Sequence, residues 1–391
     1  MSSLTSSSML MRRIISSTSI SRRFFGKTTT IEISPTTALL GSSPIKLHTE
    51  FLAATKNSST TNTDDDDKEQ GNDNNDNNEY TILFLHGLLG NGRNLKTFAR
   101  NVVKQQSSSS SSSSSSKNGC RGGILMDLRG HGKSYQTQKQ DNDNDNDNDN
   151  DTYATISTFQ DCTQDIDYTL KEFHKNTIKA EAPTSVIVGH SFGGRLALEY
   201  AAANAVSKST STSLKAVWLL DTVPGEANDS VDHVLGIITD VIHNTSISSR
   251  GEEKSLNQKE IVDILTQEPY KMDLGTAQWL AMSYDSQNND FGFDNDLVTR
   301  LKPEFSNQDF MGMLRTILEN NNNNNNNSDS DTHVHLVRGG KNIGWSIPII
   351  SKFEALTKEF PSTFHLHVLH KSGHNVHVDD MHGLVKLFSG T

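Results

Sequence analysis

The feature that most constrains the fold is the five-residue turn Gly189-His190-Ser191-Phe192-Gly193. It follows Ser185–Val188 (SVIV), which has the composition of a buried strand, and leads into Phe192–Ala203, which is rich in small helix-forming residues. A serine on such a strand-to-helix turn has a strained backbone, which is tolerated only where neighbouring residues lack bulk. We therefore predict a nucleophile elbow, formed by Gly189, His190 and Gly193, that presents Ser191 at the edge of a sheet.

Strands and helices alternate on both sides of this turn. Further buried strands are predicted at Thr81–His86, Gly123–Asp127, Ala216–Leu220, His333–Val337 and Phe364–Leu369. Alternation of this kind predicts an α/β fold with a mostly parallel central sheet flanked by helices. From Pro224 to Glu319 only helical patterns occur, so we expect a helical lid at about 225–319, inserted after the sixth strand. Such a lid would cover the carboxyl edge of the sheet, where open α/β sheets bind ligands.

Purely polar runs interrupt this pattern and lower the hydrophobic fraction to 33%. They fall in the segments 105–119, 137–152 and 320–331, which include runs of serine, alternating Asp and Asn, and asparagine. Such segments bury too little apolar surface to offset the entropy of ordering, so we expect disordered insertions. The sequence thus predicts one catalytic domain at 80–391, preceded by a variable, partly disordered segment at 32–79.

The net charge of −11 has a local origin. Asp64–Glu79 contributes −7 and Asp141–Asp151 contributes −6, so the rest of the chain sums to +2. A nearly neutral catalytic domain gives no electrostatic reason to expect a nucleic-acid partner. The two cysteines, Cys120 and Cys162, have no metal-ligand spacing, and no apolar run is long enough for a stable membrane span.

The N-terminal segment 1–31 is basic and rich in serine and threonine. It has no acid before Glu32, and its cations are Arg12, Arg13, Arg22, Arg23 and Lys27. This composition is typical of an organelle transit peptide, most simply a mitochondrial one. The alternatives are a plastid transit peptide, or a cytoplasmic protein with an untargeted tail.

A serine hydroxyl becomes an effective nucleophile when a base removes its proton. The base is expected on the loop after the last strand, where Gly373 allows the chain to turn so that His374 points back over the sheet. His370 at the strand end and His377 at the start of the closing helix are the competitors. We predict His374 as the base.

The acid that orients the base is harder to place. The loop after His333–Val337 reads RGGKNIGW and contains no carboxylate. Asn342 in this loop could hold the tautomer of the histidine, but it could not stabilise an imidazolium charge comparably. Asp221 ends the strand after the nucleophile and keeps the chain order Ser, Asp, His, so we predict it as the third member. Its alternative role is to cap the turn before Pro224.

A tetrahedral intermediate also needs two N–H groups aimed at its oxyanion. Phe192, which follows the nucleophile, is predicted to supply one. Leu88, in the glycine-containing loop His86–Asn91, is predicted to supply the other, with His86 bracing this loop. The segment Asp127–Ser134 (DLRGHGKS) is interpreted as a structural turn.

The motifs HGLLGN, DLRGHGKS, GHSFGG, LLDTVPG and SGHNVHVDD occur in this order over about Tyr80–Phe388. With them the chain resembles the α/β-hydrolase superfamily, and more narrowly the serine esterase group of abhydrolase domain-containing protein 11 and its bacterial and plant relatives. The resemblance implies cleavage of carboxylic ester or thioester bonds, and a triad acid after the strand that follows the nucleophile, which matches Asp221. The human member of the group is mitochondrial, in line with the basic N-terminus.

The predicted function is hydrolysis of a small-molecule ester or thioester, with an apolar acyl group, through an acyl-enzyme and without a metal or organic cofactor. Two alternatives stay open. GHSFGGRLALEYA also resembles a menaquinone-pathway synthase on the same fold, which suggests a lyase or C–C hydrolase with a basic pocket. The third reading is a non-catalytic receptor on a hydrolase fold. The sequence does not predict the oligomeric state.

Overall fold

The structure is a computed structural model that divides the chain into two units, Met1–Gly41 and Ser42–Thr391. It describes residues 21–24, 27–30, 43–54, 79–109, 119–136, 158–176, 183–207, 214–227, 230–246, 256–323 and 331–389. In the first unit, β1 (Ser21–Phe24) and β2 (Lys27–Thr30) form an antiparallel hairpin. The rest of the predicted transit peptide and the predicted insertion 137–152 lie outside the described residues.

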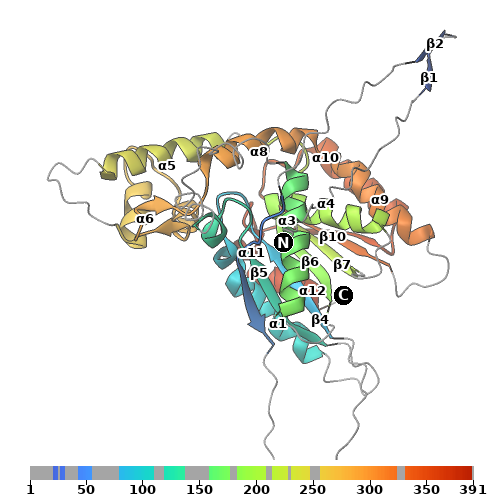
Figure 1. The fold of residues 1–391 in the computed structure, drawn as a ribbon, viewed down its shortest axis with the longest axis horizontal. Helices are drawn as coiled ribbons and strands as arrows, with labels where there is room; N and C mark the ends of the chain where they lie inside the picture. The colour runs from blue at the N-terminus through green and yellow to red at the C-terminus, as the bar shows by residue number, and fades with distance from the viewer. Residues whose placement is uncertain are drawn as a thin grey trace, which may run out of the picture. The chain divides into compact units, whose positions relative to one another are not determined.

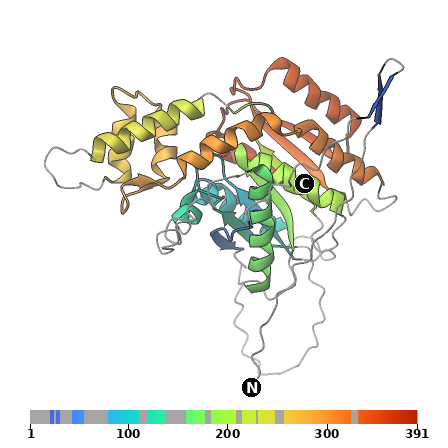
Figure 2. The ribbon, with the colours of Figure 1, turned by 45° about the horizontal axis from the view of Figure 1, so that its top comes forward.

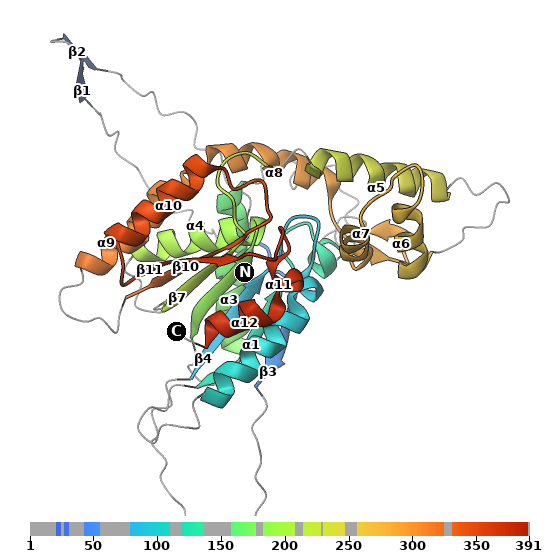
Figure 3. The ribbon, with the colours of Figure 1, turned by 180° about the vertical axis from the view of Figure 1, so that it is seen from behind.

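The second unit is built on a seven-stranded sheet with the order β11-β10-β7-β6-β4-β5-β3 (Figures 1 and 3). The strands are β3 (Thr49–Ala53), β4 (Tyr80–Leu85), β5 (Cys120–Met126), β6 (Thr184–His190), β7 (Ala216–Leu220), β10 (His333–Gly339) and β11 (Phe364–Leu369). Adjacent strands are parallel, except that the edge strand β3 runs antiparallel to β5. The predicted mostly parallel sheet is confirmed.

The edge strand β3 lies in the segment 32–79 that we predicted to be variable. It is ordered because the chain before it is tied to a helix of the domain, α3 (Phe159–Asn176). The N–H of Ile45 donates to Asp165 at 2.8 Å, and the N–H of Leu47 donates to Thr169 Oγ1 at 2.9 Å. These long-range bonds have no signal in the local sequence.

Helices cover both faces of the sheet, as Figures 1 and 3 show. The 3-10 turn η1 (Gly92–Leu95), α1 (Lys96–Ser109) and α12 (Met381–Phe388) pack on one face, where the Phe98 and Phe388 rings are 5.7 Å apart. The other face is covered by α3, α4 (Phe192–Ser207), α9 (Phe310–Asn323) and α10 (Ile347–Glu359). The short α11 (Val376–Asp379) precedes α12.

Two of the predicted insertions overlap helices of the structure. Helix α1 continues through Ser109, and α9 continues through Asn323. Polar side chains hold these helix ends by hydrogen bonds: Gln106 donates to the Phe388 carbonyl at 2.6 Å, and Asn320 donates to the Ala205 carbonyl at 3.0 Å. Low-complexity composition therefore does not exclude ordered structure where amide groups meet backbone partners.

The segment that we predicted to be a lid, called the lid region below, follows β7. This is the fifth strand of the seven-stranded sheet along the chain rather than the predicted sixth, because β3 is the one described strand of that sheet before β4. The lid region contains α5 (Ser230–Ser246), α6 (Gln258–Thr266), α7 (Leu274–Ala281), a hairpin of β8 (Tyr284–Asp285) and β9 (Asp290–Phe291), and α8 (Asn295–Asn307). The yellow and gold helices gather beside the sheet in Figure 2. The predicted boundary at 319 falls inside α9, which packs along α4 as a flanking helix. The hairpin was not predicted.

Both ends of the lid region meet at Arg195, on the first turn of α4. Its side chain is buried, and its guanidinium donates to the carbonyls of Val223 and Gly225 at the start of the region. It also donates to the carbonyl of Phe305 in α8 at 3.0 Å. Burial lowers the pKa of Arg195 to about 10, which leaves it cationic at neutral pH. A single charged side chain thus joins the helix of the elbow to both connections of the lid.

A histidine ladder lies on the last two strands of the sheet and consists of His333, His335, His365 and His367. The ring of His335 stacks on Trp218 with centroids 4.0 Å apart, and its Nδ1 lies 3.2 Å from His367 Nε2. Burial, followed by the neighbouring imidazoles, lowers the pKa of His335 to about 2. In the folded protein this ring is therefore neutral down to strongly acidic pH.

The histidine ladder predicts a loss of stability in acid. In the unfolded chain His335 regains a pKa near 6.5, so between about pH 6.5 and 2 the unfolded state binds more protons and the free energy of unfolding falls as the pH falls. We expect His335→Phe to reduce the slope of the urea midpoint against pH between pH 7.5 and 5. His370→Phe, at an exposed strand end, is the control and should keep the wild-type slope. Equal slopes in all three proteins would contradict this assignment.

Candidate active site

Ser191 lies on the sharp turn between β6 and α4. Its φ is 51°, in the left-handed region that non-glycine residues rarely adopt. The neighbouring glycines make this turn feasible, because a Cβ at Gly189 would lie 2.2 Å from the Gly193 carbonyl oxygen, and one at Gly193 would lie 2.4 Å from the Leu85 carbonyl oxygen. The N–H of Ser191 donates to the Leu220 carbonyl at 3.0 Å. The serine is thus held at the carboxyl edge of the sheet, against the end of β7.

His374 and Asp221 form a hydrogen-bonded pair at the same edge. His374 Nδ1 lies 2.7 Å from Asp221 Oδ2; the Asp221 side chain is fully buried, while that of His374 is 48% exposed. Because Nδ1 donates to the carboxylate, Nε2 is left as the free acceptor of the neutral ring. This is the tautomer that a general base needs.

The Asp221 carboxylate accepts three further hydrogen bonds. Oδ1 receives the N–H of Gly339 at 2.7 Å and the indole N–H of Trp345 at 2.7 Å, and Oδ2 receives the side-chain amide of Asn342. Four donors around one buried carboxylate stabilise its negative charge and fix its orientation. Asn342, the alternative third member from the sequence, therefore contacts the acid, and no hydrogen bond joins it to His374 in the described residues. The contribution of Trp345 was missed, although the RGGKNIGW loop contains it.

His190, the residue before Ser191, lies against His374. The rings of His190 and His374 lie 4.8 Å apart, and β6 and β7 are in register with His190 opposite Leu220. In the described part of the chain no hydrogen bond joins Ser191 Oγ to His374. Such bonds are often long without substrate and tighten when it binds. The competitors are placed elsewhere: His370 is exposed at the end of β11, and His377 is buried within α11.

The loop after β4 lies beside the serine, since a Cβ at Gly87 would be 3.5 Å from Ser191 Cβ. The Gly87 carbonyl accepts from His86 Nδ1 at 2.8 Å and from the Gly90 N–H at 3.1 Å. The carbonyl and the next N–H belong to one planar peptide, so fixing the carbonyl also aims the Leu88 N–H. Within the described residues neither this N–H nor that of Phe192, the first residue of α4, donates to a protein atom. Both are available to a bound oxyanion.

Two buried histidines clamp this loop to the loop after β5. The N–H of Leu128 donates to His86 Nε2 at 2.9 Å, and the N–H of Leu89 donates to His131 Nε2 at 3.2 Å. Burial lowers the pKa of His86 to about 4 and that of His131 to about 3, so both rings stay neutral and accept these bonds.

The rest of Asp127–Ser134 is structural, as interpreted from the sequence. Asp127 accepts the N–H groups of Gly92 and Lys133, and Arg129 forms a buried ion pair with Asp165 at 2.6 Å.

Residues at the two ends of the lid hairpin bond to the loops after β4 and β5. The Ser283 hydroxyl donates to the Leu89 carbonyl at 3.0 Å, and the N–H of Gly132 donates to the Gly292 carbonyl at 2.6 Å. The peptide groups of Leu89 are thus held from both sides, by His131 and by the lid. The sequence contained no signal for Ser283.

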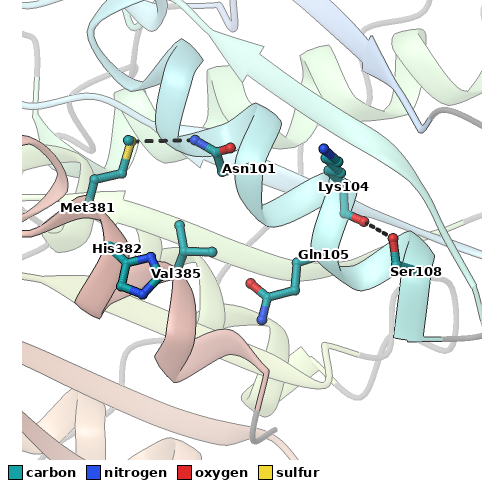
Figure 4. Close-up of a pocket in the computed structure, with 7 residues that line it drawn as sticks. All are labelled: Asn101, Lys104, Gln105, Ser108, Met381, His382 and Val385. Atoms are coloured by element: carbon teal, nitrogen blue, oxygen red, sulfur yellow. Dashed lines mark hydrogen bonds between the residues drawn. The ribbon is translucent and has the colours of Figure 1, made fainter.

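Two cavities lie outside the group formed by Ser191, Asp221 and His374. One, of 330 Å³, lies between α1 and α12 and is lined by Asn101, Lys104, Gln105, Ser108, Met381, His382 and Val385 (Figure 4). The other, of 430 Å³, lies between η1, the loop after β5 and the lid hairpin. Neither is lined by Ser191 or His374.

The described ranges contain no group of three or more His, Cys, Asp or Glu side chains placed to hold a metal ion. They also contain no helix long and apolar enough to cross a membrane. Cys120 and Cys162 are both buried, and burial raises the pKa of each thiol.

A family model described as the alpha/beta hydrolase fold matches residues 80–238, which contain β4, the elbow and Asp221. The order of the sheet and the turn at Ser191 agree with this match. The chain has the α/β-hydrolase fold. The narrower resemblance to one serine esterase group stays a prediction.

Several solved structures of α/β-hydrolase proteins are similar to this chain. An esterase from M. tuberculosis is 16% identical, with 80% of this chain and 85% of that chain covered and a TM-score of 0.44. A peroxisomal alpha-beta-hydrolase from Saccharomyces cerevisiae is 11% identical, with coverage of 88% and 87% and a TM-score of 0.49. The thioesterase domain from the curacin biosynthetic pathway is 17% identical, with coverage of 79% and 90% and a TM-score of 0.46. No curated protein sequence matches the chain.

Asp221 and Asn342 are the two candidates for the third member of the triad, and mutation can separate them. Asp221→Asn keeps the shape of the side chain but removes the charge opposite the imidazolium, so we expect kcat for ester hydrolysis to fall about 10³- to 10⁴-fold. Asn342→Ala removes one of four donors to the carboxylate, and we expect a fall of about 10-fold or less. Steady-state kinetics on a p-nitrophenyl ester measures both. A large loss in Asn342→Ala alone would show that the acid is misassigned.

The bracing role of His86 can be tested in the same assay. His86→Phe keeps a ring but removes one of the two donors to the Gly87 carbonyl and the acceptor of the Leu128 N–H. The Leu88 N–H is then held less firmly, and we expect kcat to fall about 10²-fold. The control is His174→Phe, because His174 bonds Thr184 at the opposite end of β6. Equal effects of the two substitutions would argue against a specific role for His86.

Proposed function

We propose that this chain is a serine hydrolase that cleaves carboxylic ester or thioester bonds through an acyl-enzyme intermediate. The observation that carries the proposal is the hydrogen-bonded His374–Asp221 pair at the sheet edge that also presents Ser191 on a strained turn. The two N–H groups of Leu88 and Phe192, which lack protein acceptors in the described residues, support the same chemistry.

In the proposed mechanism, Nε2 of His374 removes the proton of Ser191 Oγ while Oγ attacks the substrate carbonyl. Negative charge then develops on the carbonyl oxygen, and the N–H groups of Leu88 and Phe192 bind it. The imidazolium passes its proton to the leaving alkoxide or thiolate, which departs and leaves the acyl group on Ser191. A water molecule, deprotonated by His374, releases the acid. Asp221 orients the ring and stabilises its positive charge throughout.

The α/β-hydrolase fold is compatible with the two alternatives from the sequence, but they lack support of this kind. A lyase or C–C hydrolase for a dianionic substrate needs a basic pocket. The two buried arginines beside the loops of the site are already engaged, Arg129 by Asp165 and Arg195 by backbone carbonyls. A non-catalytic receptor would have no need of the His374–Asp221 pair or of strain at Ser191.

A fluorophosphonate probe tests the proposal. We expect the wild-type protein to be labelled at Ser191, because the activated hydroxyl attacks phosphorus as it attacks a carbonyl, and Ser191→Ala to show neither labelling nor turnover of p-nitrophenyl butyrate. Labelling is read by mass spectrometry of the intact protein. A folded wild-type protein that is not labelled would support the receptor reading. Labelling without turnover of any ester or thioester in a panel of acyl lengths would favour the C–C hydrolase.

We also propose that residues 1–31 direct the protein to mitochondria, on the basis of their basic, acid-free composition. A fusion of residues 1–31 to a fluorescent protein should co-localise with a mitochondrial marker. The control replaces Arg12, Arg13, Arg22 and Arg23 by glutamine and should remain cytoplasmic. Plastid or diffuse fluorescence of the unmodified fusion would reject the proposal.

A further inference from the structure

His190, the residue before the serine, makes a contact that the mechanism above does not use. Its ring is buried, and its Nε2 lies 3.0 Å from the backbone carbonyl oxygen of His374. A carbonyl only accepts, so Nε2 carries the hydrogen and donates it. The elbow thus bonds directly to the main chain of the residue proposed as the base, 184 positions later.

This hydrogen bond gives His374 a second point of attachment, in addition to its bond to Asp221. His374 lies on the loop after β11 with a half-exposed side chain, and its only side-chain hydrogen bond within the described residues joins Nδ1 to Asp221. One bond at Nδ1 leaves the ring free to pivot about that atom, which would move Nε2 away from the serine. A bond at the His374 carbonyl fixes the main chain from which the ring extends, and so limits the movement of the ring.

The two anchors come from neighbouring strand ends. His190 is the last residue of β6, Asp221 follows β7, and the register pairs His190 with Leu220. The same sheet ladder that positions Ser191 therefore also positions both groups that hold His374. The distance between nucleophile and base is set by strands, which are stiffer than the loop of the base.

The His190 ring is enclosed by other groups and uncharged. Its ring lies 4.8 Å from that of His374 and 4.5 Å from that of His377, and a Cβ at Gly87 would come within 2.9 Å of its Nδ1. Burial, together with these neighbouring imidazoles, lowers the pKa of His190 well below its usual value. A neutral donor holds the loop without placing a second cation beside the imidazolium that forms on His374 during turnover.

We propose that His190 is a positioning residue for catalysis, which holds the main chain of His374 so that its Nε2 stays within reach of Ser191. The proposal rests on the serine hydrolase function proposed above. His190 then affects kcat by positioning His374. It does not contact the substrate and has no effect on substrate binding.

The test compares substitutions that keep or remove the donor in the full-length protein. His190→Phe keeps a buried ring but has no donor, and we expect kcat for p-nitrophenyl butyrate to fall about 100-fold with KM within about 3-fold. His190→Gln places an amide N–H near the position of Nε2 and should recover kcat to within about 5-fold of the wild type. The matched control is His377→Phe, in the same cluster but without a bond to His374, and it should keep kcat within about 3-fold. Each variant is normalised to the fraction labelled at completion by a fluorophosphonate.

The outcomes separate the two proposals. Wild-type protein that is not labelled at Ser191 refutes the serine hydrolase and His190's role with it. Labelled wild type with unchanged kcat in His190→Phe, or an equal loss in His190→Phe and His377→Phe, overturns only the role of His190. If His190→Phe does not fold, His190→Gln is compared with His190→Asn, whose shorter side chain does not reach the His374 carbonyl. Equal kcat in these two amides overturns the proposal, and a specific loss in His190→Asn supports it.

Discussion

The buried carboxylate of Asp221 is the interaction on which the arrangement of the site depends. It binds the end of β10 through Gly339, the loop after β10 through Asn342 and Trp345, and the loop after β11 through His374. A fully buried carboxylate is costly unless donors surround it, and four do so here. Each donor comes from a segment far from β7 in the sequence. The charge therefore acts as a folding constraint, because the loops around it satisfy it only when all are in place.

Much of the fold could be predicted because buried parallel strands leave short apolar runs, and because the turn at Ser191 tolerates little but glycine beside it. SVIV and AVWLL were placed correctly, and so was the helix that begins at Phe192. The edge strand β3 was not predicted, because TEFLA lacks the apolar run of a buried strand. Its order depends on Asp165 and Thr169, more than a hundred residues away. The polar ends of α1 and α9 were not predicted for a related reason. Their side-chain amides bond to backbone carbonyls that lie nearby only in the folded chain.

At the candidate site, the residues proposed for catalysis were easier to predict than the residues that hydrogen-bond to them. Ser191, Asp221 and His374 each follow the carboxyl end of a strand. Because these strands are parallel, the three residues lie at the same edge of the sheet. The roles of Asn342 and Trp345 depend on which side of the RGGKNIGW loop faces β7, and local pattern does not determine this. The same holds for Ser283, whose bond to Leu89 requires the lid hairpin to fold over the loop after β4. Such contacts are tertiary, and a single sequence carries no signal for them.

Three neutral imidazoles join loops around Ser191, in addition to the carboxylates of Asp127 and Asp221. His86 and His131 connect the loops after β4 and β5, and His190 connects the elbow to the loop of His374. Burial keeps all three uncharged, so each gives a directional hydrogen bond without adding a field of its own. In the mechanism proposed here, the charges that appear during turnover are the oxyanion and the imidazolium of His374, with Asp221 as the fixed counterion. The three imidazoles therefore hold these loops without adding a charge that would compete with the oxyanion and the imidazolium for the groups aimed at them.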